Sequence, residues 1–325
     1  MTWDYRAPWW LPGGNLQTIY AAKFASRYDG TGPTWTRERW CTPDKDFVDV
    51  DWQIELEPLA KDTPLLVLFH GLEGSSNSHY VEAFAVEAQM RGWGMAVPHF
   101  RGCSGELNWM PRAYHSGDYE EIDWMLKKFR AQHAGPIYAV GVSLGGNALM
   151  RWAGEMGKAA GQLVQGIASI CSPIDLTASG KAIDSGLNRV IYARMFLASM
   201  KPRAMQKLQQ FPRLFDPEEL MSANTLYDFD AVFTAPLHGF KNTDDYWRRA
   251  SAKPGLSCIQ IPALVLNACN DPFVPASSLP TQAQISDYVT LWQPKSGGHV
   301  GFTSGKFPGD LKEMPNTVLK WMTHG

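Results

Sequence analysis

The sequence of 325 residues lacks several features that mark particular protein classes. Its five cysteines are scattered and odd in number, and none stands in a Cys-x-x-Cys or Cys/His spacing that suits a zinc site. We interpret them as reduced thiols of a cytoplasmic protein, most of them core fillers. No apolar run is long enough to span a bilayer, and the N-terminus has no basic region followed by an apolar one, so we expect neither a membrane span nor a signal peptide.

The chain also lacks a surplus of charge of one sign. Its 30 Lys and Arg against 32 Asp and Glu give a formal net charge of −2. No basic block is apparent, so the sequence offers no signal for nucleic acid or for an anionic membrane surface. Nothing in it implies a metal or an organic cofactor.

Apolar residues and tryptophan are plentiful. A hydrophobic content of 45% is ample for one large domain or for a core with an insertion. Trp3, Trp9 and Trp10 stand close together among the 13 tryptophans. We expect them to pack within the protein rather than to face a hydrophobic ligand or a membrane, because no cationic face accompanies them.

Strand-like and helix-like patterns alternate through the first half of the chain. After a half-exposed antiparallel strand at 47–54, the apolar strand-like runs are 65–70, 95–100, 137–140 and 166–171, and the helix-like stretches between them are 80–90, 118–132 and 146–156. Such alternation predicts an α/β fold with a mostly parallel, doubly wound sheet that is covered by helices on both faces.

The alternation stops near residue 175 and resumes with strand-like runs at 261–267 and 288–292 and a helix at 313–322. We therefore predict a core of residues 1–175 and 258–325, with residues 176–257 inserted as a helical cap. Six of its flexible apolar residues are candidates for an acyl-chain pocket, although most should only bury the cap against the core. These are Met195, Phe196, Leu197, Met200, Met205 and Leu208.

The pentapeptide Gly141-Val142-Ser143-Leu144-Gly145 carries the clearest functional signal. It lies between a strand-like run and a helix-like stretch, which is the context of a nucleophile elbow. There, glycines two residues either side of the serine let the backbone pass closely, and a strained turn lifts the serine Oγ over the end of the sheet. The pentapeptide alone is not specific, and the alternative is a glycine-rich turn without chemistry.

Two further candidates follow predicted strands, at the edge where open α/β sheets bind ligands. Asp271 follows the strand-like run 261–267, and His299 lies in a glycine-rich loop after the last strand. The order Ser143, Asp271, His299 is that of an α/β-hydrolase triad. In it, His299 would take the proton of the Ser143 hydroxyl and Asp271 would orient the imidazole.

Each assignment has an alternative. His299 is otherwise a loop histidine bonded to backbone, the usual fate of a single histidine. Asp175 follows the run 166–171 and is a rival to Asp271 for the carboxylate. We favour Asp271 because its Asn-Asp-Pro loop follows a strand in the expected place.

An oxyanion hole needs two backbone N–H groups. One should come from Leu144, the residue after the nucleophile, and the other from the loop after the strand-like run 65–70. In that loop, His70-Gly71-Leu72-Glu73-Gly74, we predict Leu72 as the donor. The alternative interpretation is that this loop is only a tight turn. The two interpretations are compatible, because a tight turn can orient the backbone N–H toward the oxyanion.

Several segments together resemble a known family. The chain is similar to the YheT-like, AB-hydrolase-4 branch of the α/β-hydrolase superfamily, a group of predicted esterases. The segments that carry this resemblance are Asn15–Thr18, His70–Gly74, His99–Gly105, Tyr114–Gly117, Ser143–Asn147, the run Asp230…Gly239-Phe240…Asp245-Tyr246…Ser251, Asn270-Asp271 and Gly297–Phe302. The resemblance implies ester hydrolysis with Ser143, Asp271 and His299 as the triad, and names no substrate. Asn15 and Trp247 depart from the family pattern, where His and Tyr are usual, and leave the shape of the substrate open.

The sequence thus predicts a serine carboxylesterase that cleaves small to medium-chain acyl esters through an acyl-enzyme. An acyltransferase or ester synthase would use the same triad, with an alcohol in place of water. A non-catalytic binding module on the same fold would predict a broken triad, and this triad is intact. The expected partner is a small-molecule acyl ester, and the oligomeric state stays open.

Overall fold

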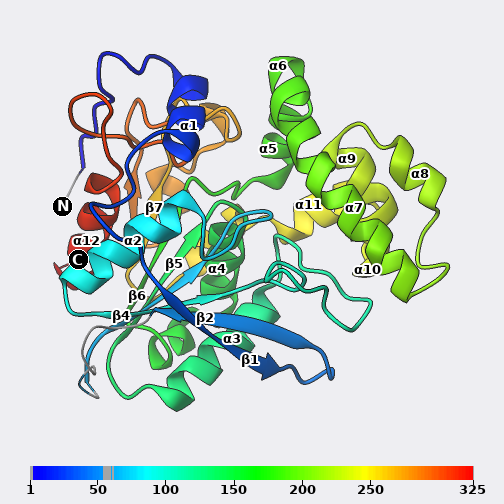
Figure 1. Ribbon diagram of the computed structural model, residues 1–325, viewed down its shortest axis with the longest axis horizontal. Helices are drawn as coiled ribbons and strands as arrows, with labels where there is room; N and C mark the ends of the chain where they lie inside the picture. Colours follow the sequence, from blue (N-terminus) through cyan, green and yellow to red (C-terminus); the bar gives the residue numbers. More distant parts are fainter. Residues whose placement is uncertain (1–2, 54–59, 61, 325) are drawn as a thin grey trace.

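The computed structural model describes residues 3–53, 60 and 62–324 (Figure 1). Within them a single sheet holds the strands in the order β1-β2-β4-β3-β5-β6-β7-β8. The strands are β1 (Trp35–Cys41), β2 (Phe47–Gln53), β3 (Leu65–Phe69), β4 (Gly94–Pro98), β5 (Ile137–Val142), β6 (Gly166–Ile170), β7 (Ala263–Leu266) and β8 (Val289–Trp292). The six strands from β4 to β8 in this order are parallel to their neighbours. β2 is antiparallel to β4, and β1 is antiparallel to β2. The predicted, mostly parallel sheet is therefore confirmed.

Helices cover both faces of the sheet because its central strands are apolar on both sides. β3, β4 and β6 are buried along their whole length. One face packs against α3 (Tyr119–Gln132) and α4 (Leu144–Met156), and the other against α2 (His79–Met90) and α12 (Glu313–His324). In α3, an apolar stripe at spacings of three and four residues is buried against the sheet: Ile122, Met125, Leu126 and Phe129.

The prediction for strand 47–54 was wrong in one respect: β2 is almost wholly buried rather than half-exposed. Its acidic residues Asp49 and Asp51 are buried because β1 supplies a bidentate arginine to each. Arg39 holds Asp49 at 2.8 and 2.9 Å, and Arg37 holds Asp51 at 2.7 and 2.9 Å. Residue 54, the predicted end of the strand, lies outside the described residues.

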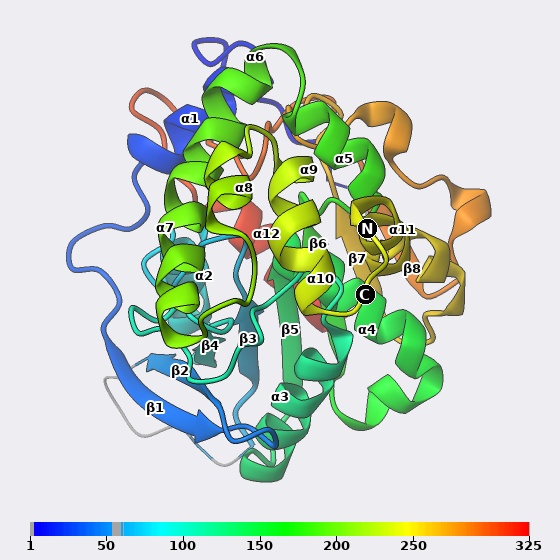
Figure 2. The same cartoon turned by 90° about the vertical axis from the view of Figure 1, so that its right-hand side faces the viewer.

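The segment between β6 and β7 is helical and gathers on one side of the sheet (Figures 1 and 2). It comprises α5 (Leu176–Ile183), α6 (Gly186–Asn188), a π-helical turn (Arg189–Ala193), α7 (Arg194–Gln210), α8 (Pro217–Ser222), α9 (Leu226–Phe229), a second π-helical turn (Asp230–Thr234), α10 (Ala235–Leu237) and α11 (Thr243–Ala250). We infer that residues 176–257 act as a cap on a core of residues 1–175 and 258–325, of which 1, 2, 54–59, 61 and 325 lie outside the described residues. The segment 176–257 has its own apolar cluster, centred on Leu197, Leu220 and Phe229.

The N-terminal tryptophans pack only in part. Trp3 contacts the rings of Tyr5 and Phe302, and Trp10 contacts those of Tyr20 and Phe307. Trp9, in contrast, is 92% exposed. No helix of the described residues is long and apolar enough to cross a membrane.

Candidate active site

Ser143 lies at the junction of β5 and α4, and its backbone has a conformation that residues other than glycine rarely adopt. Its φ is 52° and its ψ −120°, which places strain at the turn. The flanking glycines are required by space. A Cβ at Gly141 would lie 2.5 Å from the Gly145 carbonyl oxygen, and one at Gly145 would lie 2.4 Å from the Phe69 carbonyl oxygen. The close approach of β3, β5 and α4 therefore explains the Gly-x-Ser-x-Gly pattern.

The three predicted triad residues lie in hydrogen-bonding distance of one another. The Ser143 Oγ is 3.0 Å from His299 Nε2, and His299 Nδ1 is 2.9 Å from Asp271 Oδ2. Asp271 has a fully buried side chain, and its Oδ1 accepts the backbone N–H groups of Phe273 and Val274. Because the carboxylate accepts the Nδ1 proton, Nε2 is left to accept the serine proton.

The rival carboxylate serves a different purpose. Asp175 caps the N-terminus of α5, where its Oδ1 accepts the N–H of Ala178 at 3.1 Å, and its Oδ2 lies 3.9 Å from Lys253 Nζ. Among the described hydrogen bonds none joins Asp175 to His299. The geometry therefore favours Asp271 as the partner of the histidine.

The loop that carries His299 is held by α1 (Gly14–Lys23), which the sequence reasoning did not foresee. The Thr18 hydroxyl accepts the backbone N–H of His299 at 2.8 Å. The buried Gln17 accepts the N–H of Gly297 at 2.9 Å and an amide N–H of Asn270 at 2.9 Å. These bonds fix the backbone on both sides of the imidazole. The segment Asn15–Thr18 gave a family signal, but no local pattern reveals partners some 280 residues away in the chain.

Cys171 lies beside the triad, and the ligand atoms of Cys171, Asp271 and His299 all lie within 4.8 Å of one another. Its Sγ accepts the backbone N–H of Val300 at 3.2 Å and so also holds the histidine loop. Burial raises the pKa of this thiol well above its usual range. A metal would need the thiolate and would compete with the bond between Asp271 and His299, so these residues suit proton transfer better than metal binding.

The loop after β3 leaves one backbone N–H available. Gly71 donates to the Tyr80 hydroxyl, Glu73 to the Tyr114 hydroxyl and Gly74 to the Gly71 carbonyl. Within the described residues, the N–H of Leu72 has no such acceptor. Leu144 is the first residue of α4, where the N–H groups have no intrahelical partner and the helix dipole is positive. Both residues line the same cavity as Ser143, which fits the two predicted oxyanion donors.

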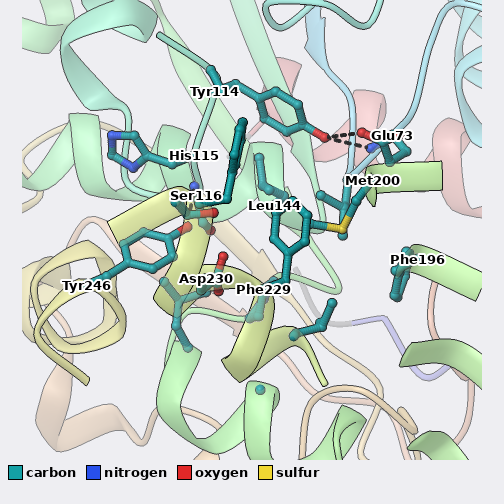
Figure 3. Close-up of a pocket in the computed structure, with 18 of the residues that line it drawn as sticks. Glu73, Tyr114, His115, Ser116, Leu144, Phe196, Met200, Phe229, Asp230 and Tyr246 are labelled. Atoms are coloured by element: carbon teal, nitrogen blue, oxygen red, sulfur yellow. Dashed lines mark hydrogen bonds between the residues drawn. The ribbon is translucent and has the colours of Figure 1, made fainter. Parts of the chain in front are cut away.

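Glu73, next to Leu72, is held in a strained conformation by Tyr114. Its φ is 57°, in the left-handed region. The Tyr114 hydroxyl donates to Glu73 Oε1 at 2.8 Å and accepts the Glu73 N–H at 3.1 Å, as Figure 3 shows. Arg203 of α7 reaches the same Oε1 at 3.0 Å. These contacts fix the backbone that aims the Leu72 N–H.

From the predicted role of Leu72 as an oxyanion donor, we expect replacement of Tyr114 by phenylalanine to lower kcat about tenfold with little change in KM, because a misplaced donor weakens only the transition state. The loss stays below that of a deleted donor, about 10²–10³ in kcat. Steady-state kinetics on one soluble ester measure it. Tyr246→Phe is the matched control, since that hydroxyl lies in the same cavity but accepts from Ser116. A raised KM at unchanged kcat would contradict the positioning role.

A cavity of about 150 Å³ is lined by Ser143 and His299. Figure 3 shows other residues of its wall, among them Leu144, Phe196 and Met200. Its walls combine the loops at the carboxyl ends of the strands with apolar side chains of the segment 176–257, among them Ile183, Phe196, Met200, Leu226, Phe229, Phe233 and Trp247. Of the six candidates for an acyl pocket, Phe196 and Met200 line the cavity. Leu197 and Met205 pack in the apolar cluster of the segment 176–257, Leu208 is half-buried away from the lining, and Met195 is 53% exposed.

Asp230 is a carboxyl group in the apolar wall. Its Oδ2 accepts the indole N–H of Trp247 at 2.8 Å, and burial raises its pKa to about 6. Because the native state then binds the proton more tightly than the unfolded chain, Asp230 costs stability as the pH rises through the interval from about 4 to 6.

Asp230→Asn should therefore stabilise the protein at neutral pH. The substitution keeps an oxygen acceptor for Trp247 but cannot ionise. We expect its advantage in unfolding free energy over the wild type to grow by about 2 kcal/mol between pH 4.5 and pH 7.5. Urea unfolding at both pH values measures it. An advantage that does not depend on pH would show that Asp230 stays ionised without penalty.

Comparisons with known proteins agree with this geometry. The family model described as alpha/beta hydrolase fold matches residues 64–306. The Putative esterase YheT of Escherichia coli is 37% identical over 95% of this chain and 90% of its own length. Phospholipase ABHD3 of Mus musculus is 28% identical over 81% of this chain and 64% of its own.

A solved structure is similar in fold alone. The Pyrobaculum calidifontis esterase superposes with a TM-score of 0.55 at 17% identity, over 95% of this chain and 88% of that one. The match of the family model over most of the chain and the identity to the Escherichia coli protein lead to one conclusion. This chain belongs to the alpha/beta hydrolase fold family, in its YheT-like branch.

Proposed function

We propose that this chain, a carboxylic ester hydrolase, cleaves small to medium-chain acyl esters through an acyl-enzyme on Ser143. The observation that carries the proposal is the relay of Ser143, His299 and Asp271, with contacts of 3.0 and 2.9 Å, at the floor of an apolar cavity. Relatives named as an esterase and a phospholipase support ester cleavage.

The first half of the reaction forms the acyl-enzyme. Ser143 Oγ attacks the ester carbonyl carbon while its proton passes to His299 Nε2, and Asp271 stabilises the resulting imidazolium. The carbonyl oxygen becomes an oxyanion that accepts the N–H groups of Leu72 and Leu144. As the bond to the alcohol oxygen breaks, His299 returns the proton to that oxygen and the alcohol leaves.

The second half repeats the same steps with water. His299 Nε2 takes a proton from water, the hydroxide oxygen attacks the acyl carbon, and the tetrahedral oxyanion is held by the same two N–H groups. Its collapse breaks the bond to Ser143 Oγ, which regains the proton, and the carboxylic acid departs. An alcohol in place of water would give a new ester with the same residues, so the acyltransferase alternative is a matter of which acceptor reaches the acyl-enzyme.

Trapping the acyl-enzyme tests the proposal. A p-nitrophenyl ester mixed with the protein should release a burst of nitrophenol, and peptide mapping of the quenched protein should place the acyl group on Ser143. Added ethanol separates the alternatives, since an ester synthase forms the ethyl ester in preference to the acid. The absence of any adduct on Ser143 under single-turnover conditions would overturn the mechanism.

The lining of the cavity predicts a dependence on chain length. Each methylene buried against Phe196, Met200 and their neighbours contributes about 0.8 kcal/mol, so kcat/KM should rise about three- to fourfold per carbon until the cavity is full. A series from acetyl to decanoyl esters measures the rise and its end. A flat profile would mean that the segment 176–257 does not receive the acyl chain.

A matched pair of methionines on α7 locates the acyl chain. Met200→Trp should shift the optimum to shorter chains, because Met200 lines the cavity. Met195→Trp should leave the optimum unchanged, since Met195 is 53% exposed on the same helix. If both variants shift the optimum equally, the change comes from the helix as a whole rather than from the cavity wall.

A further inference from the structure

Exposed apolar side chains are concentrated on two elements of the fold. They belong to α1 with its adjacent loops (Trp9, Leu16, Ile19, Phe24 and Phe307) and to the segment from α6 to the start of α7 (Leu187, Val190, Ile191 and Met195). Together they are the majority of the large apolar residues that are exposed in the described part of the chain. Scattered exposed apolar residues need no explanation, but a concentration of this kind marks an interaction surface.

The two elements are in contact with each other. The Tyr192 hydroxyl, between Ile191 and α7, donates to Asn15 Oδ1 of α1 at 2.7 Å. Figures 1 and 2 show α1 and α6 at the same upper end of the molecule. On the α1 side, ring contacts join Trp10 to Tyr20 and Phe307, so the loops there extend the same surface. We call residues 9–24, 187–195 and Phe307 the α1–α7 surface.

The charge of this surface is entirely basic. Within residues 9–24 and 187–195 there are three basic residues, Lys23, Arg189 and Arg194, and no acidic one, in a chain with a net charge of −2. A search for a basic block misses them because apolar residues separate them. Arg189 and Arg194 are exposed, as is Lys23 of α1. None of these three forms an ion pair within the described residues.

The surface borders the cavity over Ser143. Two consecutive residues of α7 belong to different sites: Met195 is exposed on the α1–α7 surface, and Phe196 lines the cavity. Beneath the π-helical turn, Tyr192 packs its ring against Phe273 at 4.5 Å, and Phe273 in turn packs against His299 at 4.2 Å. A partner bound to the α1–α7 surface thus lies next to the cavity over Ser143.

We propose that the α1–α7 surface docks on an anionic lipid surface. Its apolar side chains would enter the boundary between headgroups and acyl chains, and Lys23, Arg189 and Arg194 would meet the anionic headgroups. A face whose own charged residues are all basic and lie among apolar ones is complementary to such a surface. A second copy of the chain is disfavoured, because a twofold interface would bring these unpaired cations toward one another. That the docked lipid supplies substrate rests on the proposed function, whereas docking itself does not.

Flotation of the full chain with vesicles tests the proposal. Vesicles of phosphatidylcholine with about one-third phosphatidylglycerol should carry the protein, and pure phosphatidylcholine vesicles should carry much less of it. Arg189→Glu with Arg194→Glu should weaken the binding constant by at least about 25-fold, since each basic residue near an anionic surface contributes about a fivefold factor. Ser143→Ala should bind like the wild type, which separates this test from that of the mechanism.

Two controls exclude general effects. Lys158→Glu with Lys320→Glu makes the same change in net charge at exposed sites outside the α1–α7 surface, and should bind like the wild type. Val190→Ser with Ile191→Ser should weaken binding, whereas Met90→Ser, at a residue 72% exposed on α2, should not. Turnover of a water-soluble short-chain ester should be unchanged in the Arg189 and Arg194 variant, which shows that it is folded.

Three results would overturn the proposal. The first is equal flotation of the wild type and the Arg189 and Arg194 variant. The second is an equal loss of flotation in the charge-matched control, which would make binding a consequence of net charge. The third is a dimer in light scattering that the serine variants dissociate, which would make the α1–α7 surface an interface between copies of the chain.

Discussion

Alanine in place of Ser143 is expected to lower kcat/KM for any acyl ester by about 10⁴ to 10⁶. The estimate follows serine hydrolases, in which removal of the nucleophile costs about as much as removal of the whole triad. The residual rate would come from the oxyanion donors and from binding. A fluorophosphonate probe should label the wild type once per chain, and the label should be absent from the variant.

Ser179→Ala is a matched control for this loss. Ser179 also lines the cavity, and its buried hydroxyl has no hydrogen-bond partner among the described residues. Removing it should leave kcat/KM within a few-fold of the wild type and leave the stability unchanged or raised, because an unsatisfied polar group is lost. Equal labelling of Ser143→Ala and the wild type would rule out Ser143 as the nucleophile.

The sequence predicted those parts of the molecule that depend on chain order. Strands buried on both faces have continuous apolar runs, so β3, β4 and β6 are recognisable without any knowledge of their neighbours. In a parallel sheet each loop after a strand reaches the same edge. The sequence alone could therefore predict that Ser143, Asp271 and His299 lie close together, because each follows a strand.

What the sequence did not predict depends on contacts between distant residues. The buried Asp49 and Asp51 looked like the polar side of a strand, because their arginine partners stand on another strand. Gln17 and Thr18 hold the histidine loop across most of the chain length. Such partners have no local period or spacing, and only the folded backbone brings them together.

The helix α7 shows a second limit of sequence patterns. Apolar residues occur around most of its circumference, so periodicity cannot tell the face toward the cavity from the face toward the cap or the outside. Met195, Phe196 and Leu197 are consecutive, yet the first is exposed, the second lines the cavity and the third is buried in the apolar cluster of the segment 176–257. For the same reason the basic residues of this segment gave no amphipathic signal in the sequence.

The carboxylate that orients His299 can be identified by a pair of isosteric substitutions. Asp271→Asn should lower kcat by about 10⁴, because the amide can no longer hold the Nδ1 proton in place and the histidine presents the wrong tautomer to Ser143. The fold should persist, since the amide oxygen still accepts the N–H groups of Phe273 and Val274.

Asp175→Asn should keep kcat near that of the wild type, because Asp175 bonds the N–H of Ala178 at the start of α5 and asparagine caps a helix about as well. Asp175→Ala should cost about 1 kcal/mol of unfolding free energy through the lost cap, again with kcat little changed. Kinetics and urea unfolding of the three variants therefore separate catalysis from capping. If Asp175→Asn is the inactive variant while Asp271→Asn stays near wild type, the hydrogen bond of 2.9 Å between Asp271 and His299 is not the one that catalysis uses.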